Sequence, residues 1–289
     1  MKIYKIIILV VLLLSSFLFG KFYKPKAQKY AITVIEINGV IVSSHNIIKQ
    51  IHAAVREKDN KAIILRINSP GGAVGPTQEI FYEVKRIDDM YTSSNGKKGK
   101  PIYTSINTMA ASGGYYIASA TRRIYASRGV LTGSIGVMLK FNDLSGLFNL
   151  ASVKHSSIVS GKYKDIGSIH REMTSDEKDM LHGLAYRMHQ EFINDILSKR
   201  KDKIKGDINE LAQGQLFTGL SAYDSGLVDK NLGLWAAGRE IHTELKLKTP
   251  FGFYFQKNKN TMSLRFLFNK AKIMIQYYRS LISETTLTE

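Results

Sequence analysis

The chain reads KAIILRI at residues 61–67 and then NSPGG at residues 68–72. An almost uninterrupted apolar run of this length is typical of a strand that is buried on both faces of a parallel sheet. The glycine pair that follows marks a loop at the carboxyl end of that strand, where the backbone is able to approach a ligand closely. This stretch therefore predicts a parallel sheet with a candidate binding loop at its edge.

Strands and helices alternate along the rest of the chain. Further strands are predicted at residues 30–37, 101–106, 123–126, 135–139 and 153–158. Helices are predicted from Ser44, around Pro76, over 109–120, and from Ser175 to about Lys199. The alternation predicts an α/β fold with parallel strand pairing.

Composition excludes several classes of chemistry. The 289 residues include no cysteine, which rules out disulfides, a thiolate nucleophile and thiolate metal sites. The net charge of +17 divides into six positive charges in residues 1–30, five in residues 239–289 and only six in the long centre. A nucleic-acid binder concentrates positive charge on its folded face, so we expect no nucleic-acid partner. Basic ends beside apolar runs fit an anionic membrane surface.

The N-terminus contains an apolar run from Ile6 to Phe19 that extends, with flanking residues, from Ile3 to Tyr23. These 21 residues are long enough for a transmembrane helix. No small-x-small cleavage site follows, so we predict an uncleaved signal anchor, with a cleaved secretory signal as the alternative. Lysines flank the run on both sides. By a simple count of these lysines, the positive-inside rule places the long domain in the cytoplasm. That rule is weak for long translocated domains.

The C-terminal segment has a different character. Its apolar residues from Leu264 to Ile282 follow helical spacing, and basic residues occupy the other face. This predicts an amphipathic helix that lies in lipid headgroups or packs on a neighbouring protomer; the periodicity leaves both open. We divide the chain into an anchor with a basic juxtamembrane segment (1–29), a main domain (30–246) and a basic tail (247–289).

A candidate nucleophile lies in AASGG at residues 110–114. Small neighbours at a strand-to-helix turn would leave the hydroxyl of Ser112 unhindered. The N–H of Gly113 would then lie at a helix start, where the dipole favours developing negative charge, and with the N–H of Gly72 it could form an oxyanion hole. The alternative is that Ser112 is an ordinary N-cap residue.

A candidate base lies in SGKYKD at residues 160–165. A serine hydroxyl needs a base to become a nucleophile. A lysine serves only if its pKa falls from about 10.4 toward neutrality, which burial in an apolar site can supply. Lys164 is the candidate, and the alternative is an exposed surface lysine.

The seven histidines offer no competing triad. His155 and His170 flank the lysine loop, but no local pattern joins either to an orienting carboxylate. His182 and His189 share a helix face at a spacing of seven residues, without the zinc-binding pair four residues apart. We interpret all seven as structural or surface residues.

The motifs together resemble the signal peptide peptidase A family of Ser–Lys proteases. The resemblance rests on five segments and covers about residues 31 to 238: NSPGG at 68–72, MAASGGYY at 109–116, LTGSIGV at 131–137, SGKYKD at 160–165 and REMT at 171–174. It implies that Ser112 is the nucleophile and Lys164 the general base. It also implies that Gly72 and Gly113 supply the oxyanion-hole amides and that Ser134 orients the lysine amine.

The resemblance carries wider expectations. It implies a Clp-protease- and crotonase-like fold of repeated ββα units, and a ring of eight protomers in which serine and lysine meet across a subunit boundary. The expected substrates are remnant signal peptides and other extended hydrophobic peptides, and no metal or cofactor is needed. The expected location is the bacterial inner membrane, single-pass, with the catalytic domain outside. Residues 92–100 resemble an insertion, Ile169 replaces a common proline, and the tail after 250 lacks a family motif.

Two rival functions remain at this stage. A crotonase-like acyl-CoA enzyme would use the same oxyanion hole for a different reaction, although the anchor and the Ser112–Lys164 pair speak against it. An inactive membrane scaffold would keep the ring without catalysis.

Overall fold

A computed structural model describes residues 30–256 of the chain. The predicted signal anchor (1–29) and the predicted amphipathic helix near the C-terminus lie outside the described residues. Between residues 30 and 256, no helix combines the length and the apolar character needed to cross a bilayer. Residues 30–254 belong to one compact unit, and Phe255 begins a second unit that is mostly outside the described part.

A seven-stranded, mainly parallel sheet is the centre of the described part, in the order β6-β5-β3-β2-β1-β7 with β4 also beside β3. β1, β2, β3, β4 and β5 pair in parallel, and β6 pairs antiparallel with β5. The strands are β1 (Ile32–Asn38), β2 (Ala62–Ser69), β3 (Ile102–Ala111), β4 (Arg123–Ala126), β5 (Leu131–Gly133), β6 (Leu216–Thr218) and β7 (Phe253–Phe255).

β2 shows why this sequence forms a doubly covered sheet. Ile63, Leu65 and Ile67 point to one face, and Ala62 and Ile64 point to the other. All five side chains are fully buried. A strand that is apolar on both faces is stable only when helices cover both faces, so the prediction from this stretch is confirmed.

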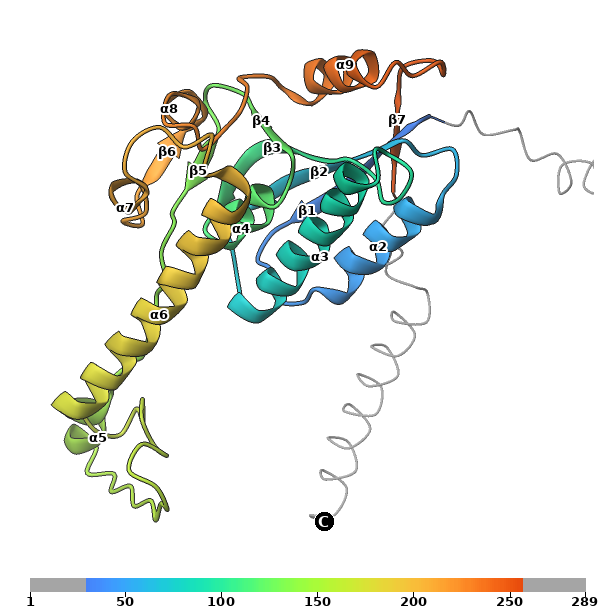
Figure 1. The fold of residues 1–289 in the computed structure, drawn as a ribbon. Helices are drawn as coiled ribbons and strands as arrows, with labels where there is room; N and C mark the ends of the chain where they lie inside the picture. The colour runs from blue at the N-terminus through green and yellow to red at the C-terminus, as the bar shows by residue number, and fades with distance from the viewer. Residues whose placement is uncertain (1–29, 257–289) are drawn as a thin grey trace, which may run out of the picture. The chain divides into compact units, whose positions relative to one another are not determined.

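Helices cover the two faces of the sheet unequally (Figure 1). One face packs against α2 (His45–Arg56), α3 (Val74–Ser93), α4 (Gly113–Ser119) and the C-terminal half of α6 (Ser175–Arg200). The other face packs against α9 (Leu234–Glu244). The remaining short helices are α5 (Ser145–Leu150), α7 (Ile208–Leu211) and α8 (Gly219–Asp224). The mixed α/β architecture with a parallel-dominated sheet agrees with the prediction.

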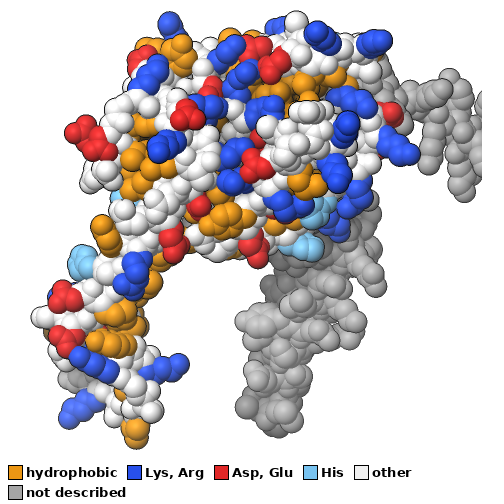
Figure 2. Space-filling view, viewed as in Figure 1, with side chains coloured by type: hydrophobic (Ala, Val, Ile, Leu, Met, Phe, Trp, Pro, Cys, Tyr) orange, Lys and Arg blue, Asp and Glu red, His pale blue; other side chains and the backbone are white. Residues whose placement is uncertain are grey.

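Residues 135–174 form an arm that starts at the sheet, where Ile135 is buried, and extends to the N-terminal end of α6 (Figure 1). A capping box starts α6: the Thr174 hydroxyl accepts from the Glu177 N–H, and the Glu177 carboxylate accepts from the Thr174 N–H. The arm contains α5 and otherwise turns and irregular backbone. Figure 2 shows hydrophobic side chains on this part of the surface, and the exposed apolar residues of the arm include Met138, Phe141, Leu144, Leu147, Leu150, Val153, Ile158 and Val159.

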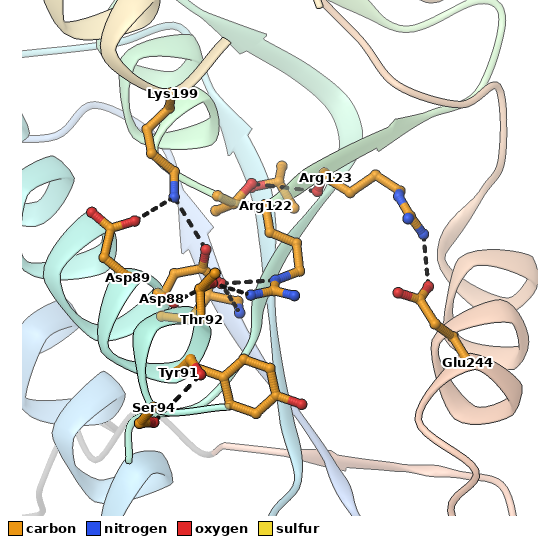
Figure 3. A network of polar contacts seen from close by, with 12 residues as sticks. Asp88, Asp89, Tyr91, Thr92, Ser94, Arg122, Arg123, Lys199 and Glu244 are labelled. Carbon is orange, nitrogen blue, oxygen red and sulfur yellow. Dashed lines mark hydrogen bonds and ion pairs between the residues drawn. The ribbon is translucent and has the colours of Figure 1, made fainter. Parts of the chain in front are cut away.

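A buried carboxylate ties α3, β3 and α6 together (Figure 3). The Asp88 side chain is 2% exposed and accepts hydrogen bonds from the Ile102 N–H at 3.0 Å and from Arg122 Nε at 3.1 Å. Lys199 Nζ, from α6, lies 3.2 Å from the same carboxylate. A buried carboxylate with two cationic partners and a backbone donor is fully satisfied, so it fixes α6 against the sheet.

Two predicted strands are wrong. The segments 135–139 and 153–158 form no strand, and both belong to the arm. Their β-branched residues are typical of a strand, but Ile158 is fully exposed. Among residues 30–256, the one backbone hydrogen bond made by 135–139 runs from the Gly214 N–H to the Ile135 carbonyl. The helix predicted over 109–120 is also wrong at its start, because β3 continues to Ala111 and α4 begins at Gly113.

Candidate active site

The carboxyl ends of three parallel strands meet at one edge of the sheet. Ser69 of β2 lies opposite Ala110 of β3, and Ala111 lies opposite Gly133 of β5. The residues directly after these strands are therefore neighbours, as expected where loops leave a parallel sheet. They open onto a cavity of about 680 Å³ whose lining includes Gly72, Thr77, Ser112, Gly113, Tyr116, Ser134, Met188, His189 and Phe192.

Ser112 occupies a sharp turn between β3 and α4. Its backbone has φ of 50° and ψ of −120°, a conformation that a residue with a side chain rarely adopts. Such a residue stores roughly 1–3 kcal/mol of strain and persists only where its surroundings enforce it. Here the Ser112 N–H donates to the Gly133 carbonyl at 2.8 Å, and the Ser112 carbonyl accepts from Tyr116 in α4. The turn leaves the hydroxyl half-buried at the cavity, as the sequence predicted.

Two backbone N–H groups converge beside Ser112. Ile41 bonds through its N–H to the Gly71 carbonyl and through its carbonyl to the Ala73 N–H, so the amide of Gly72 between them points away from Ile41. A methyl group on Gly113 would lie only 3.3 Å from the Gly72 nitrogen. Within residues 30–256 neither N–H of this glycine pair donates to a protein acceptor. Two unpaired donors next to a hydroxyl are suited to stabilise an oxyanion.

Glycine is required at both positions by close packing. A Cβ on Gly72 would lie 2.1 Å from the Ile41 carbonyl oxygen, which is far inside contact distance. A Cβ on Gly113 would lie 2.8 Å from Thr77 Oγ1. The small residues in NSPGG and AASGG therefore let two loops approach backbone to backbone.

Ser134 also lies at the cavity. It follows β5 directly, has φ of 51°, and its N–H donates to the Gln215 carbonyl at 2.8 Å. Its neighbour Gly133 accepts the hydrogen bond from Ser112, so the two serines leave adjacent strand ends. Four of the five predicted site residues are thus brought together in one chain.

The fifth predicted residue, Lys164, lies elsewhere. It is exposed in the arm and is not among the residues that line the cavity. Within the described part of the chain its ammonium has no ion-pair partner, whereas the neighbouring Lys162 pairs with Asp176 at 2.5 Å. Met188 lines the cavity from α6, and the helix runs on to Ser175 for about 20 Å at 1.5 Å per residue. The first turn of α6 is therefore farther from Met188 than a lysine side chain extends.

Arg171 fixes the lysine loop to the first turn of α6. Its guanidinium bonds Asp165, the residue after Lys164, at 2.5 Å and Glu177 at 2.6 and 2.8 Å. These hydrogen bonds hold the pKa of Asp165 below its usual range and lower the pKa of Glu177 to about 2. The fork geometry of arginine suits two carboxylates at once, so the loop that carries Lys164 has a defined position.

The cavity wall opposite the glycine loops is apolar. Tyr116 of α4 stacks on Phe192 of α6 with ring centroids 4.2 Å apart. The Tyr116 hydroxyl donates to Asp195 at 2.5 Å, and burial, reinforced by this bond, raises the pKa of Tyr116. Met188 lies one helical turn before Phe192 on the same helix face. In residues 30–256 no cluster of three acidic or histidine side chains could hold a metal ion.

Comparison with known proteins identifies the family. A family profile described as peptidase family S49 matches residues 94–248, which is more than half of the chain. The chain belongs to peptidase family S49. A second profile, described as Clp protease, matches residues 27–124, in agreement with the parallel sheet. The resemblance to signal peptide peptidase A is thereby confirmed, and the chain is a serine-type protease of this family.

Individual relatives of this S49 peptidase agree with the family. A protein from Synechocystis sp. that is named as a protease is 34% identical over 72% of both chains. A protein from Enterococcus faecium that is named as a signal peptide peptidase is 30% identical, covering 71% of this chain and 60% of its own length. The chloroplastic serine protease SPPA of Arabidopsis thaliana is 31% identical over 68% of this chain, which is 28% of its length. The match thus spans less than two thirds of the last two proteins.

Sequence reasoning missed the α6 side of the S49 site. Met188, His189 and Phe192 follow the strand-end motifs by more than fifty residues and carry no motif of their own. The spacing of Met188 and Phe192 by four residues is the only signal, and it is equally typical of core packing. His189 also lines the cavity, and nothing in its sequence pattern distinguishes it from the other histidines. His155 and His170 instead stack on each other with ring centroids 3.8 Å apart.

Proposed function

We propose that this S49 peptidase is a membrane-anchored endopeptidase that hydrolyses remnant signal peptides and other extended hydrophobic peptides. One observation carries the proposal: Ser112 is held in a strained turn beside two N–H groups, those of Gly72 and Gly113, that have no acceptor in the described part of the chain. The apolar wall of Tyr116 and Phe192 suits apolar substrate side chains.

The proposed mechanism assigns one role to each residue. Lys164 in its neutral form accepts the proton of the Ser112 hydroxyl, and the serine oxygen attacks the peptide carbonyl. The N–H groups of Gly72 and Gly113 stabilise the oxyanion. Lys164 then donates its proton to the leaving amine, and water hydrolyses the acyl-enzyme. Ser134 hydrogen-bonds the lysine amine and orients it toward Ser112.

Lys164 is proposed to act on Ser112 of a neighbouring copy in a ring of eight. The separation along α6 supports this, because Arg171 holds the loop of Lys164 at the first turn of α6, whereas the cavity is lined by α6 only from Met188 onward. The exposed apolar side chains of the arm support it too, since Leu147 and Leu150 are 60% and 84% exposed. Apolar residues exposed in this number are expected to be covered by another protein surface. Burial by a neighbour would also desolvate the amine.

The anchor proposed for residues 1–29 would hold the site near peptides that lie in the bilayer. The location that goes with it is the bacterial inner membrane, with the catalytic domain on the outer side. The apolar run from Ile6 to Phe19 and the basic residues around it support this arrangement.

The test uses the full chain purified in detergent and a fluorogenic apolar peptide. Ser112→Ala and Lys164→Ala are each expected to abolish cleavage, whereas Lys162→Ala, which removes the same charge two residues away, keeps it. Full activity of the Lys164→Ala variant would exclude the proposed Ser112–Lys164 catalytic dyad. A serine-directed acylating probe that leaves Ser112 unlabelled in an intact oligomer would favour an inactive scaffold.

Mixing two inactive variants tests the shared site. In rings assembled from equal amounts of the Ser112→Ala and Lys164→Ala chains, about a quarter of the subunit boundaries bring an intact serine to an intact lysine. Activity near that fraction of wild type is expected after co-assembly. No recovery in confirmed mixed rings would place both residues of each working site in one chain.

A further inference from the structure

A second cavity, of about 500 Å³, lies at the end of the molecule where β1 begins. Four lysines line it: Lys61, Lys100, Lys246 and Lys248. They come from three separate segments, namely the start of β2, the loop after α3 and the segment after α9. No carboxylate is among the lining residues. Figure 2 shows Lys and Arg side chains gathered over this end of the molecule.

Two carboxylates on the elements around this lysine cavity are paired with other cations, whereas Glu57 acts on Lys100 without forming an ion pair in the described part of the chain. Glu244, at the end of α9, lies 2.8 Å from Arg123, and Asp88 pairs with Arg122 and Lys199 (Figure 3). Within residues 30–256 none of the four lysines of the cavity forms an ion pair. The cavity therefore concentrates four positive charges, and no ion pair within the described part of the protein neutralises them.

Each ammonium keeps donors available for a ligand. Lys61 Nζ donates to the Lys58 carbonyl at 2.9 Å, and Lys100 Nζ donates to the Asn60 carbonyl at 2.6 Å. A lysine ammonium has three N–H donors, so these bonds leave two on each group. Burial lowers the pKa of Lys100, and the positive charge of Lys61 lowers it further, although Glu57 acts in the opposite direction. An anion between the two lysines would relieve this unfavourable arrangement.

Favourable interactions with helix dipoles do not explain why all four lysines are clustered at this cavity. Lys246 and Lys248 follow the C-terminus of α9, where a positive charge is favourable. Lys61 is at the amino end of β2, and Lys100 is seven residues beyond the end of α3, so neither is within the last turn of a helix. A bound anion accounts for all four.

We propose that the lysine cavity binds the phosphate of an anionic phospholipid headgroup. Ammonium groups bind phosphate as compact point charges, and four of them suit a phosphodiester with further anionic oxygen atoms nearby. The lining also contains Leu245, Leu247 and Tyr91, which fit the glycerol and the first acyl carbons.

The position in the chain favours a lipid over free phosphate. Ala31 lines the cavity, and the apolar run that ends at Phe19 precedes it by only a short segment. The ten residues from 20 to 29 span at most about 35 Å when fully extended. The choice of lipid rests on the proposed membrane anchor, whereas the phosphate site itself does not.

The test measures binding by calorimetry, with the full chain in the uncharged detergent dodecyl maltoside. The probes are dihexanoyl phosphatidylglycerol, dihexanoyl phosphatidylcholine and inorganic phosphate. The binding variant is Lys61→Ala with Lys248→Ala, both at exposed positions, and Lys100→Met is a second variant that keeps the buried stem. The matched control is Lys201→Ala with Lys205→Ala, which removes the same charge at the end of α6.

We expect saturable binding of the phosphatidylglycerol, weakened about tenfold or more in both cavity variants and unchanged in the control. Equal weakening of phosphatidylglycerol binding in the control variant would show that only the net charge of the protein matters, and would overturn the assignment of the binding site to the lysine cavity. Equally tight binding of phosphatidylcholine would overturn the requirement for an anionic headgroup. Inorganic phosphate that binds while phosphatidylglycerol does not would overturn the lipid assignment. Labelling of Ser112 by an acylating probe, measured in the same samples, reports separately on the proposed peptidase.

Discussion

Gly113→Ala is the sharpest test of the oxyanion hole, because the substitution keeps the N–H and changes only what surrounds it. The added Cβ would lie 2.8 Å from Thr77 Oγ1 and 3.3 Å from both Thr77 Cγ2 and the Gly72 nitrogen. Relieving these contacts requires a shift of a few tenths of an ångström. Overpacking of this kind lowers the free energy of unfolding by about 1–3 kcal/mol. The shift also moves two donors whose alignment with the oxyanion is worth about 10²–10³-fold in kcat each.

Two further variants separate the loss of stability from the loss of catalysis. Thr77→Ala removes two of the three close contacts, at the cost of the hydrogen bond from Thr77 Oγ1 to the Ala73 carbonyl, about 1 kcal/mol. Gly113→Ala combined with Thr77→Ala is therefore expected to recover most of the lost stability. Its kcat is expected to stay low, because the new methyl group still lies 3.3 Å from the Gly72 nitrogen, where an oxyanion must bind.

The assay measures kcat and KM for the fluorogenic peptide together with thermal unfolding. Gly75→Ala is the matched control, since its Cβ meets nothing within 4 Å, and it is expected to keep full activity. A kcat of Gly113→Ala within about threefold of wild type would refute the placement of the oxyanion. Recovery of kcat in parallel with stability, in the double variant, would show that the first loss came from misfolding alone.

Four further outcomes follow from the structure. Ser112→Gly relieves the strained φ and is expected to raise the free energy of unfolding by about 1 kcal/mol in urea denaturation, a gain that Ser112→Ala does not give. The pKa of Glu177 is lowered from about 4.5 to about 2, so its contribution to the free energy of unfolding is complete above pH 4.5 and is lost as the pH falls from about 4.5 to about 2. Unfolding followed by circular dichroism is expected to show this loss, and the stability of Arg171→Met is expected to depend less on pH in the same range. Arg171→Lys is expected to lower kcat about 10²-fold at similar KM, through a misplaced Lys164, without changing the oligomer measured by light scattering. Asp88→Ala is expected to cost about 3–5 kcal/mol of stability by chemical denaturation, whereas Asp89→Ala, at a half-exposed neighbour, costs less than about 1 kcal/mol.

The sheet and its loops could be predicted because local sequence determines them. A run such as 61–67 is apolar on both faces only if both faces are covered, and the glycines that follow are needed where two backbones approach. Gly72, Ser112 and Gly113 could be predicted from their positions at strand ends, whereas Ser134 could be predicted only from the family resemblance. The structure brings these four together because parallel strands deliver their carboxyl ends to the same edge.

The arm could not be predicted in the same way. Its β-branched residues at 135–139 and 153–158 are typical of strands, yet neither segment pairs with a strand among residues 30–256. The periodicity of apolar residues predicts which side chains are buried, but it does not predict which surface buries them. The α6 residues of the cavity were missed for a related reason: Met188 and Phe192 have a spacing that serves a helix packed in a core equally well.

The position of Lys164 follows from the length of one helix. Arg171 fixes the lysine loop to the first turn of α6, and Met188 meets the cavity about 20 Å further along it. A straight helix with a capping box at one end and a buried carboxylate contact at Lys199 does not bend to close that distance. The residues proposed as nucleophile and oxyanion donors thus meet in a single chain, whereas the proposed base is held away from them. Under the proposed mechanism proton transfer depends on assembly while oxyanion binding does not, so dilution of the ring should abolish turnover and leave the strained turn at Ser112 intact.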